Sequence, residues 1–206
     1  MNIIFLSNTI GNDNKILHDE IAKILTSGSQ IAYIPSKKDI ERKYFEETKK
    51  FFDQFGEYNL NYYGLEEGEW NEKFVDEISN NDAIYLSGGN TYYFLHFLKL
   101  RKMEKIIHEF VDHKTVIGTS AGGIVLTHDI SLASDEKTDE YNDSKGFGFV
   151  DFYFYPHFIE NKELIDKIKW FKFQTEKKGE VYAVDEKSSV IVKDKDIQFI
   201  GDVWEI

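Results

Sequence analysis

Short apolar runs alternate with longer amphipathic segments along most of this chain. The runs are rich in isoleucine, valine and tyrosine and nearly continuous in hydrophobicity, a pattern typical of strands buried on both faces of a parallel sheet. Four such runs lie at Asn2–Ser7, Gln30–Ile34, Ala83–Ser87 and Thr115–Thr119. A fifth, Tyr58–Tyr63, contains more polar residues and predicts a strand nearer an edge of the sheet.

The segments between these runs carry apolar residues at helical spacing. We expect helices over about Asn14–Thr26, Asp39–Gly56, Glu69–Ser79 and Thr91–His113. In the second of these, Asp39 is suited to cap the first turn and Gly56 to end the last. Its apolar positions fall largely on one face: Ile40, Tyr44, Phe45, Phe52 and Phe55. Strands alternating with helices predict an α/β fold with a doubly wound, mostly parallel sheet and helices on both faces.

The pattern changes after Leu126. The acidic segment Ser134–Asp143 has no periodicity and predicts an exposed loop, and the aromatic segment Gly146–Phe158 is strand-like. A helix is expected near Glu163–Gln174. The last part holds three strand-like runs, VYAVDE, SSVIVKD and IQFIGDVWEI, with KDKD as the turn of a C-terminal β-hairpin. No repeat or Pro/Gly-rich linker interrupts the chain, so we expect one catalytic domain over residues 1–206.

Composition narrows the class of protein. The 206 residues are 41% hydrophobic and 16% aromatic, enough to build a real core. A net charge of −12 argues against a nucleic-acid partner and otherwise favours solubility. No apolar run approaches the about 18 residues of a membrane span, and the first residues lack the basic start of a secretory signal. With no cysteine for disulfides or thiolate chemistry, a cytoplasmic enzyme is expected.

A serine boxed in by small residues directly follows the run Thr115–Thr119. Residues 118–122 read GTSAG and fit the G-x-S-x-G pattern of a nucleophile elbow, in which small neighbours make room for a strained serine backbone. The same residues also suit an ordinary strand-to-helix turn. The preceding strand and the further glycine at position 123 favour Ser120 as a nucleophile.

A serine nucleophile needs a general base, and six histidines compete for that role. Four lie in predicted helices, and His128 lies near the end of the helix that Ser120 begins. His157 follows Pro156 at the end of an aromatic strand, where it is either the base or a buried histidine of an aromatic cluster. The carboxylate that would orient it is Asp185, Glu186 or Asp135, although such acids also occupy solvated turns.

An oxyanion hole needs two N–H groups aimed at one point. Ala121 can supply one, and the SGGN segment after another predicted strand can supply the second. That segment also suits a tight turn in which Asn90 caps the next helix, and the two interpretations are compatible. The segment does not match the dinucleotide pattern G-x-G-x-x-G, and no histidine pair has zinc-site spacing, so neither a cofactor nor a metal is expected.

Taken together, AIYLSGGNTYYFLHFL, VIGTSAGGIVL, YPHF and the late VDE segment resemble the peptidase E (aspartyl dipeptidase) family of serine peptidases. That family is similar to cyanophycinases and, more distantly, to class I glutamine amidotransferases, whose fold is therefore expected. The resemblance covers nearly the whole chain in order. It implies that Ser120 is the nucleophile and His157 the general base, with the amides of Gly89 and Ala121 as oxyanion donors and Glu186 as the acid. Asp135 is the alternative acid, because an aspartate in the loop after the nucleophile has also been assigned that role in the family.

The chain departs from the aspartyl-specific members at two places. Those members carry Asn before the Pro-His pair, where this chain has Tyr155, and a Gly-Glu-Thr-Arg run soon after the histidine, where IENKELIDKIKWF has lysines but no arginine. Lysine does not reproduce the bidentate grip of arginine on a carboxylate. We therefore expect a peptidase acting on short peptides without strict specificity for N-terminal aspartate. Gly88, Asn90 and Tyr155 are expected beside the substrate.

A second interpretation belongs to another class of protein. An incomplete acid position would leave a non-catalytic peptide- or small-molecule-binding protein on the same scaffold. A glutaminase-type amidotransferase is not expected, because it would need a cysteine nucleophile and the chain has none. The expected partner is a small peptide, with no nucleic acid and no membrane. The chain is expected to be a monomer or homodimer, since the aromatic run Phe152–Tyr155 suits either a core or a dimer face.

Overall fold

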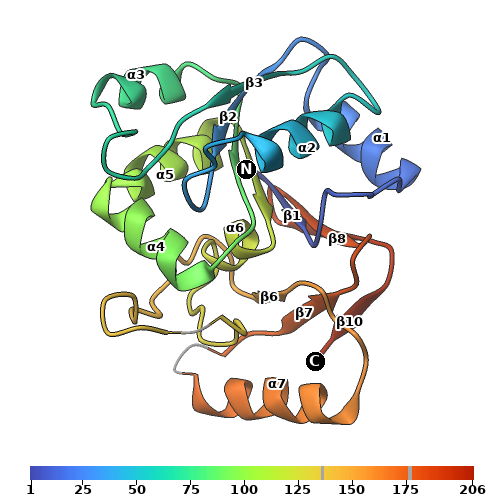
Figure 1. Cartoon of the computed structure of the whole chain (residues 1–206). Helices are drawn as coiled ribbons and strands as arrows, with labels where there is room; N and C mark the ends of the chain where they lie inside the picture. Colours follow the sequence, from blue (N-terminus) through green and yellow to red (C-terminus); the bar gives the residue numbers. More distant parts are fainter. Residues whose placement is uncertain (136, 176–177) are drawn as a thin grey trace.

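The chain folds into a seven-stranded sheet with helices on both faces and a smaller three-stranded sheet next to it, in a computed structural model that describes residues 1–135, 137–175 and 178–206 (Figure 1). The large sheet has the order β3-β2-β4-β5-β1-β8-β9. Its strands are β1 (Asn2–Leu6), β2 (Gln30–Ile34), β3 (Asn59–Tyr62), β4 (Ala83–Leu86), β5 (Thr115–Thr119), β8 (Ser189–Lys193) and β9 (Asp196–Ile200).

Strands β1 to β5 are parallel, and β8 and β9 add an antiparallel hairpin at one edge. The predicted doubly wound, mostly parallel sheet is thus confirmed, with β3 at the opposite edge as expected. In the hairpin Lys193 pairs with Asp196, so Asp194 and Lys195 form the predicted two-residue turn, and Asp194 adopts a φ of 53°. A positive φ is typical of the tight turns that join twisted strands.

Two helical layers cover the large sheet (Figure 1). Helices α1 (Lys15–Ile24) and α2 (Lys43–Phe52) lie on one face, and α3 (Lys73–Ser79), α4 (Thr91–Leu100), α5 (Met103–His113) and α6 (Ala121–Ile124) lie on the other. Because side chains alternate along a strand, adjacent residues of β1 point to opposite faces of the sheet and pack in different cores. Ile4 packs with residues of α1 and α2, whereas Ile3 packs with residues of α4 and α5.

The segment Thr91–His113 forms two helices rather than the single one expected. Helix α4 ends at Leu100, and Lys102 adopts a left-handed conformation with a φ of 55° before α5 begins. A continuous helix over this segment would be about 35 Å long, about twice the length of a strand of five residues. The break lets both halves bury an apolar face on the sheet, and Arg101 Nε donates a hydrogen bond to Leu65 O (2.7 Å) at the turn.

Helix α2 also begins later than predicted, at Lys43. Asp39 still caps it, from four residues upstream: its carboxylate accepts hydrogen bonds from the N–H groups of Lys43 (3.0 Å), Tyr44 (3.0 Å) and Phe45 (3.2 Å). Because residues 39–42 turn instead of continuing the helix, Ile40 lies outside it. The apolar face expected for this helix is therefore wrong at Ile40, and it is not buried at Tyr44 in the first turn. Ile40 is 79% exposed and Tyr44 is 48% exposed.

The second sheet was not predicted. It consists of β6 (Tyr153–Tyr155), β7 (Val181–Val184) and β10 (Val203–Glu205) in the order β10-β7-β6, and helix α7 (Lys162–Gln174) packs on it. Only three residues of the long aromatic segment form a strand, because residues 146–149 run as irregular chain bonded to the backbone of residues 125–128, just after α6. Phe152 and Phe154 join the core of the large sheet, whereas Tyr153 joins the core under α7.

The acidic segment 134–143 contains neither helix nor strand among its described residues, as expected, and residue 136 lies outside them. In the part of the chain that the structure describes, no helix is both long enough and apolar enough to cross a bilayer.

Removing the Asp39 carboxylate should weaken the start of α2. Asp39→Ala leaves three N–H groups of the first turn without their acceptor, and we expect unfolding in urea to show a loss of roughly 1–2 kcal/mol. The matched control is Asp53→Ala, at the exposed end of the same helix, which removes no capping bond. Equal stability of the two variants would contradict the capping role.

Candidate active site

The side chains expected to carry chemistry lie at the carboxyl ends of the parallel strands and in the neighbouring second sheet. Ser120 follows β5, Gly88 and Gly89 follow β4, and the polar residues from Ser7 onward follow β1. His157 comes two residues after β6. This edge of an open α/β sheet is where loops from several strands converge, which allows distant segments to form one site.

Ser120 occupies a tight turn between β5 and α6. Its backbone has φ 51° and ψ −114°, an unfavourable conformation for a residue with a side chain, and its N–H donates to Leu6 O (2.8 Å). Small neighbours are required for this close approach. A Cβ atom added at Gly122 would lie 2.1 Å from Leu86 O, and one added at Gly118 would lie 2.5 Å from the carbonyl oxygen of residue 122.

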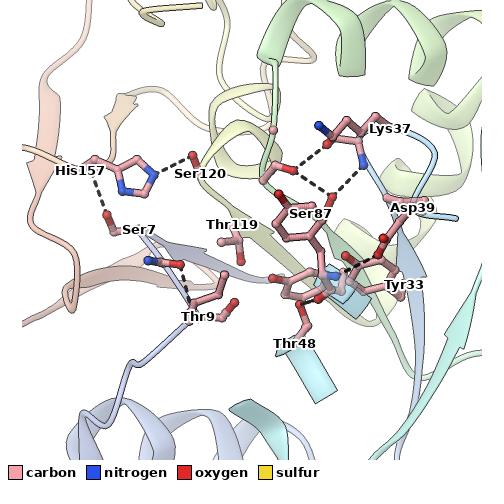
Figure 2. Close-up of a pocket in the computed structure, with 18 residues that line it drawn as sticks. Ser7, Thr9, Tyr33, Lys37, Asp39, Thr48, Ser87, Thr119, Ser120 and His157 are labelled. Atoms are coloured by element: carbon pink, nitrogen blue, oxygen red, sulfur yellow. Dashed lines mark hydrogen bonds between the residues drawn. The ribbon is translucent and has the colours of Figure 1, made fainter. Parts of the chain in front are cut away.

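The His157 ring lies between Ser120 and Glu186 and is hydrogen-bonded to both. Figure 2 shows His157 and Ser120. The Nε2 atom of the ring lies 2.9 Å from Ser120 Oγ and its Nδ1 lies 2.9 Å from Glu186 Oε1. A ring that carries its proton on Nδ1 donates a hydrogen bond to the carboxylate, which leaves Nε2 free to accept the serine proton. The geometry is therefore that of a serine, a base and an orienting acid.

Two residues that sequence reasoning missed hold this arrangement together. Ser7 Oγ accepts the backbone N–H of His157 (2.9 Å), and Asn8 Nδ2 donates to Glu186 Oε2 (3.1 Å). Ser7 is fully buried, while the Glu186 side chain is 59% exposed, so the asparagine restricts an otherwise mobile carboxylate. The sequence did contain a pattern that could have indicated these two residues, because the polar triplet Ser-Asn-Thr directly follows the buried β1.

The other two candidate acids have different partners. Asp135 Oδ2 accepts from the N–H (2.9 Å) and the hydroxyl (2.5 Å) of Thr91, at the start of α4. Asp185 Oδ1 accepts from Lys187 N (3.1 Å) and Ser188 Oγ (2.5 Å), within the turn between β7 and β8. Of the three carboxylates, only Glu186 is hydrogen-bonded to the His157 ring in the described part of the chain.

The glycine pair after β4 is in contact with the serine. A Cβ atom at Gly88 would lie 3.4 Å from Ser120 Cβ. The carbonyl oxygen of Gly88 accepts from the hydroxyls of Ser36 (2.6 Å) and Ser87 (3.2 Å). Because this peptide bond is trans, the N–H of Gly89 points the opposite way, away from those two hydroxyls.

Three further expected residues have clear positions. Ala121 is the first residue of α6, where N–H groups have no partner inside the helix. Asn90 caps α4 through its side-chain oxygen, which accepts from Tyr93 N (2.9 Å). Tyr155 is not in the wall of the cavity beside Ser120, because alternation along β6 turns its ring toward Phe158 in the core under α7. Its place beside the substrate stays a prediction.

A cavity of about 250 Å³ opens between Ser120, His157 and the carboxyl ends of β1, β2 and β4 (Figure 2). Its wall carries many hydroxyl groups, contributed by Thr9, Tyr33, Thr48, Tyr85, Ser87 and Thr119. Burial raises the pKa of both Tyr33 and Tyr85, so these phenols stay neutral at physiological pH. Among the described residues no cluster of three or more histidines and acids is arranged to hold a metal ion.

Comparison with known proteins gives consistent results. The sequence model described as "Peptidase family S51" matches residues 3–200. An uncharacterized peptidase of Listeria innocua is 26% identical over 179 residues, which cover 82% of this chain and 83% of that protein. A protein named peptidase E from Nostoc is 29% identical over 163 residues, covering 76% of this chain and 65% of that protein.

Two solved structures share the fold. A candidate peptidase E protein from Listeria monocytogenes superposes with a TM-score of 0.77 at 22% identity and covers 97% of both chains. A peptidase from an acI-B1 Actinobacterium superposes with a TM-score of 0.71 at 18% identity. The superposition covers 98% of this chain and 87% of that peptidase.

The close approach of Gly122 to Leu86 can be tested by substitution. The side chain of Gly122→Ala meets a backbone oxygen that cannot move aside, so we expect a loss of roughly 3 kcal/mol, at the upper end for an overpacked site. Gly68→Ala is the control. Gly68 has a positive φ of 84°, but a Cβ atom added there meets no atom within 4 Å, so the free energy of unfolding should fall by only about 1 kcal/mol. Thermal or urea unfolding compares them, and an equal loss in both would contradict the collision.

Proposed function

We propose that this chain, which belongs to peptidase family S51 and is a serine-type peptidase, hydrolyses short peptides through an acyl-enzyme on Ser120. The observation that best supports the proposal is the continuous hydrogen-bonded series from Ser120 Oγ through the His157 ring to Glu186. Its three members come from separate segments that the fold brings to one point. We also propose that residues 1–206 act as a single catalytic domain.

In the proposed reaction His157 Nε2 takes the proton from Ser120 Oγ as the hydroxyl attacks the peptide carbonyl. Glu186 stabilises the imidazolium that forms, through its bond to Nδ1. The N–H groups of Gly89 and Ala121 donate to the oxyanion. His157 then protonates the departing amine, which leaves as the first product. Water, activated by the same nitrogen, hydrolyses the ester to release the carboxylic acid part of the substrate and to restore the Ser120 hydroxyl.

Glu186 is proposed as the orienting acid in preference to Asp135. The carboxylate of Asp135 is held by Thr91 at the start of α4, the helix that follows the glycine pair. From there it stabilises the position of that helix rather than the tautomer of the histidine. Asp135 is therefore proposed as a structural anchor for the segment that carries Gly89.

Strict specificity for N-terminal aspartate is not expected of this site. Both arginines of the chain are engaged elsewhere: Arg42 stacks on the Tyr62 ring (3.3 Å to its centroid) and Arg101 lies over Trp70 while bonding to Leu65 O. Neither lines the cavity beside Ser120. A substrate carboxylate would therefore lack the bidentate partner that arginine provides.

Ser120→Ala tests the nucleophile. We expect kcat/KM for dipeptides to fall by on the order of 10⁴-fold or more, with little change in thermal stability, because the hydroxyl is needed for chemistry and not for packing. A serine-directed phosphonate should label the wild-type protein at this residue and leave the variant unlabelled. The matched control is Ser27→Ala, at an exposed turn.

The activity and labelling measurements also distinguish a serine peptidase from the non-catalytic binding protein. Full peptidase activity in Ser120→Ala would refute the nucleophile assignment. A wild-type protein that binds peptides but neither cleaves them nor reacts with the phosphonate would favour the non-catalytic alternative.

A pair of isosteric variants tests the choice of acid. Glu186→Gln keeps the shape of the side chain but removes the charge that stabilises the imidazolium, so kcat/KM should fall by roughly 10²–10⁴-fold. Asp135→Asn should lower it by less than about tenfold, by way of the Thr91 contact alone. The reverse ranking would assign the role to Asp135.

A further inference from the structure

We infer that the cavity beside Ser120 receives the substrate side chain on the N-terminal side of the cleaved bond, and that it selects a neutral hydrogen-bonding group, a carboxamide above all, over acidic and purely apolar groups. This inference rests on the proposed function, because only a carbonyl attacked by Ser120 places that side chain here.

The position of the cavity supports this assignment. Ser120, His157, Gly88 and Gly89 all form part of its wall, so the cavity opens at the place where the attacked carbonyl would lie. Its volume of about 250 Å³ is below the roughly 300–1,000 Å³ of pockets that enclose drug-sized ligands. A single amino-acid side chain therefore suits it better than a longer stretch of peptide.

One part of the cavity wall gathers hydroxyl groups, beside apolar surface from residues such as Ile10 and Pro35. The hydroxyls of Ser87 and Thr48 lie beside the Tyr33 phenol, and those of Thr9, Thr48 and Thr119 lie around the Tyr85 phenol. Figure 2 shows Thr9, Thr119, Tyr33 and Thr48 gathered below the Ser120–His157 pair. A hydroxyl both donates and accepts, so such a group of side chains matches a ligand that does both, as a carboxamide does.

Thr119 supplies a hydroxyl that lacks a partner. The residue is 5% exposed, and its Oγ1 lies near Tyr85 without making a hydrogen bond of normal geometry to any described residue. A buried hydroxyl left unpaired is unfavourable. Its oxygen is covered in this conformation, so a ligand that bonds to it needs a rotation of the threonine side chain toward the cavity, and the bond then removes the penalty. An apolar side chain would leave the hydroxyl unpaired and would also separate its neighbours from water.

The charges around the cavity disfavour an acidic side chain. Asp39 is part of the wall and is close enough to Tyr33 to raise the pKa of its phenol further, so a second carboxylate would be repelled. Lys37, the lysine found in the wall among the described residues, is exposed and lies in Figure 2 on the side away from Thr9 and Thr119. The Asp39 oxygens already accept three backbone N–H groups, which makes them poor partners for a basic side chain.

Four dipeptides that differ only in their first residue test the selection. Asn-Leu, Asp-Leu and Leu-Leu have first side chains of nearly the same size, and Lys-Leu adds a basic one. We expect kcat/KM for Asn-Leu to exceed each of the other three by at least about tenfold, because a site built to hydrogen-bond its substrate discriminates strongly against analogues that cannot.

Variants of the wall locate the source of the preference. Thr119→Val keeps the shape and removes the unpaired hydroxyl, and Tyr33→Phe removes one phenol; each should reduce the Asn-Leu to Leu-Leu ratio of kcat/KM by about fivefold or more. The matched control is Tyr58→Phe, a buried tyrosine whose hydroxyl bonds to Leu25 O outside the cavity (3.1 Å). It should leave the ratio unchanged.

Phosphonate labelling of Ser120 in the wild-type protein distinguishes the two ways to fail. If Ser120 is labelled but Asp-Leu, Leu-Leu or Lys-Leu is cleaved as fast as Asn-Leu, the pocket assignment is overturned and the peptidase mechanism stands. A ratio unchanged by Thr119→Val and Tyr33→Phe likewise overturns the role of the hydroxyl wall. Absence of both labelling and cleavage overturns the proposed function and this inference together.

Discussion

The packing of the small sheet on the large one is the constraint on which the site depends. Ser120 belongs to the large sheet, whereas His157 and Glu186 follow β6 and β7 of the small one. Phe5 in β1 packs against Phe152 and Phe154, with ring centroids 5.2 and 5.3 Å apart, and this aromatic contact sets the separation of the two sheets. An error of about 1 Å there would break the bond between Nε2 and Oγ, since hydrogen bonds weaken steeply beyond normal length.

Parallel pairing explains how one small sheet delivers both partners of the serine. Tyr155 in β6 pairs with Ala183 in β7, so the segments that follow leave the sheet side by side and in the same direction. One ends in His157, which adopts a φ of 56°, and the other leads to Glu186. The Ser7 hydroxyl then ties the histidine backbone to the end of β1. The strained conformations of Ser120 and His157 are each held by a hydrogen bond to the β1 segment.

The site contains two electrostatic environments. The histidine and glutamate lie at the surface, where 42% and 59% of their side chains are exposed and water can reach the proposed acyl-enzyme. Among the described residues, the cavity beside them is lined by buried neutral hydroxyls, apolar surface, the exposed Lys37 and one carboxylate, whose oxygens accept N–H groups at a helix terminus. In the proposed mechanism, proton transfer and recognition of the substrate take place on separate neighbouring surfaces, and the serine lies where they meet.

Much of the fold was predictable from the sequence, because burial on two faces leaves uninterrupted apolar runs. The strands β2 and β5 have the bounds that their runs predicted. Local pattern also singled out Ser120 and His157, since small residues around a strained turn and a proline after a strand are local requirements. The errors arose where remote contacts decide. The break at Lys102 and the late start of α2 depend on what each segment packs against.

The sequence by itself determined the parallel sheet, the glycine-lined turn at Ser120 and the absence of a cysteine-based site, because these follow from short-range patterns and composition. Only the tertiary structure decided which of Asp135, Asp185 and Glu186 meets the His157 ring, and that Ser7 and Asn8 hold the pair. It also gathered Tyr33, Tyr85, Thr9, Thr48 and Thr119 around one cavity. The reason is physical: a hydrogen bond across 2.9 Å depends on how the two sheets pack, and sequence spacing carries no information about that distance.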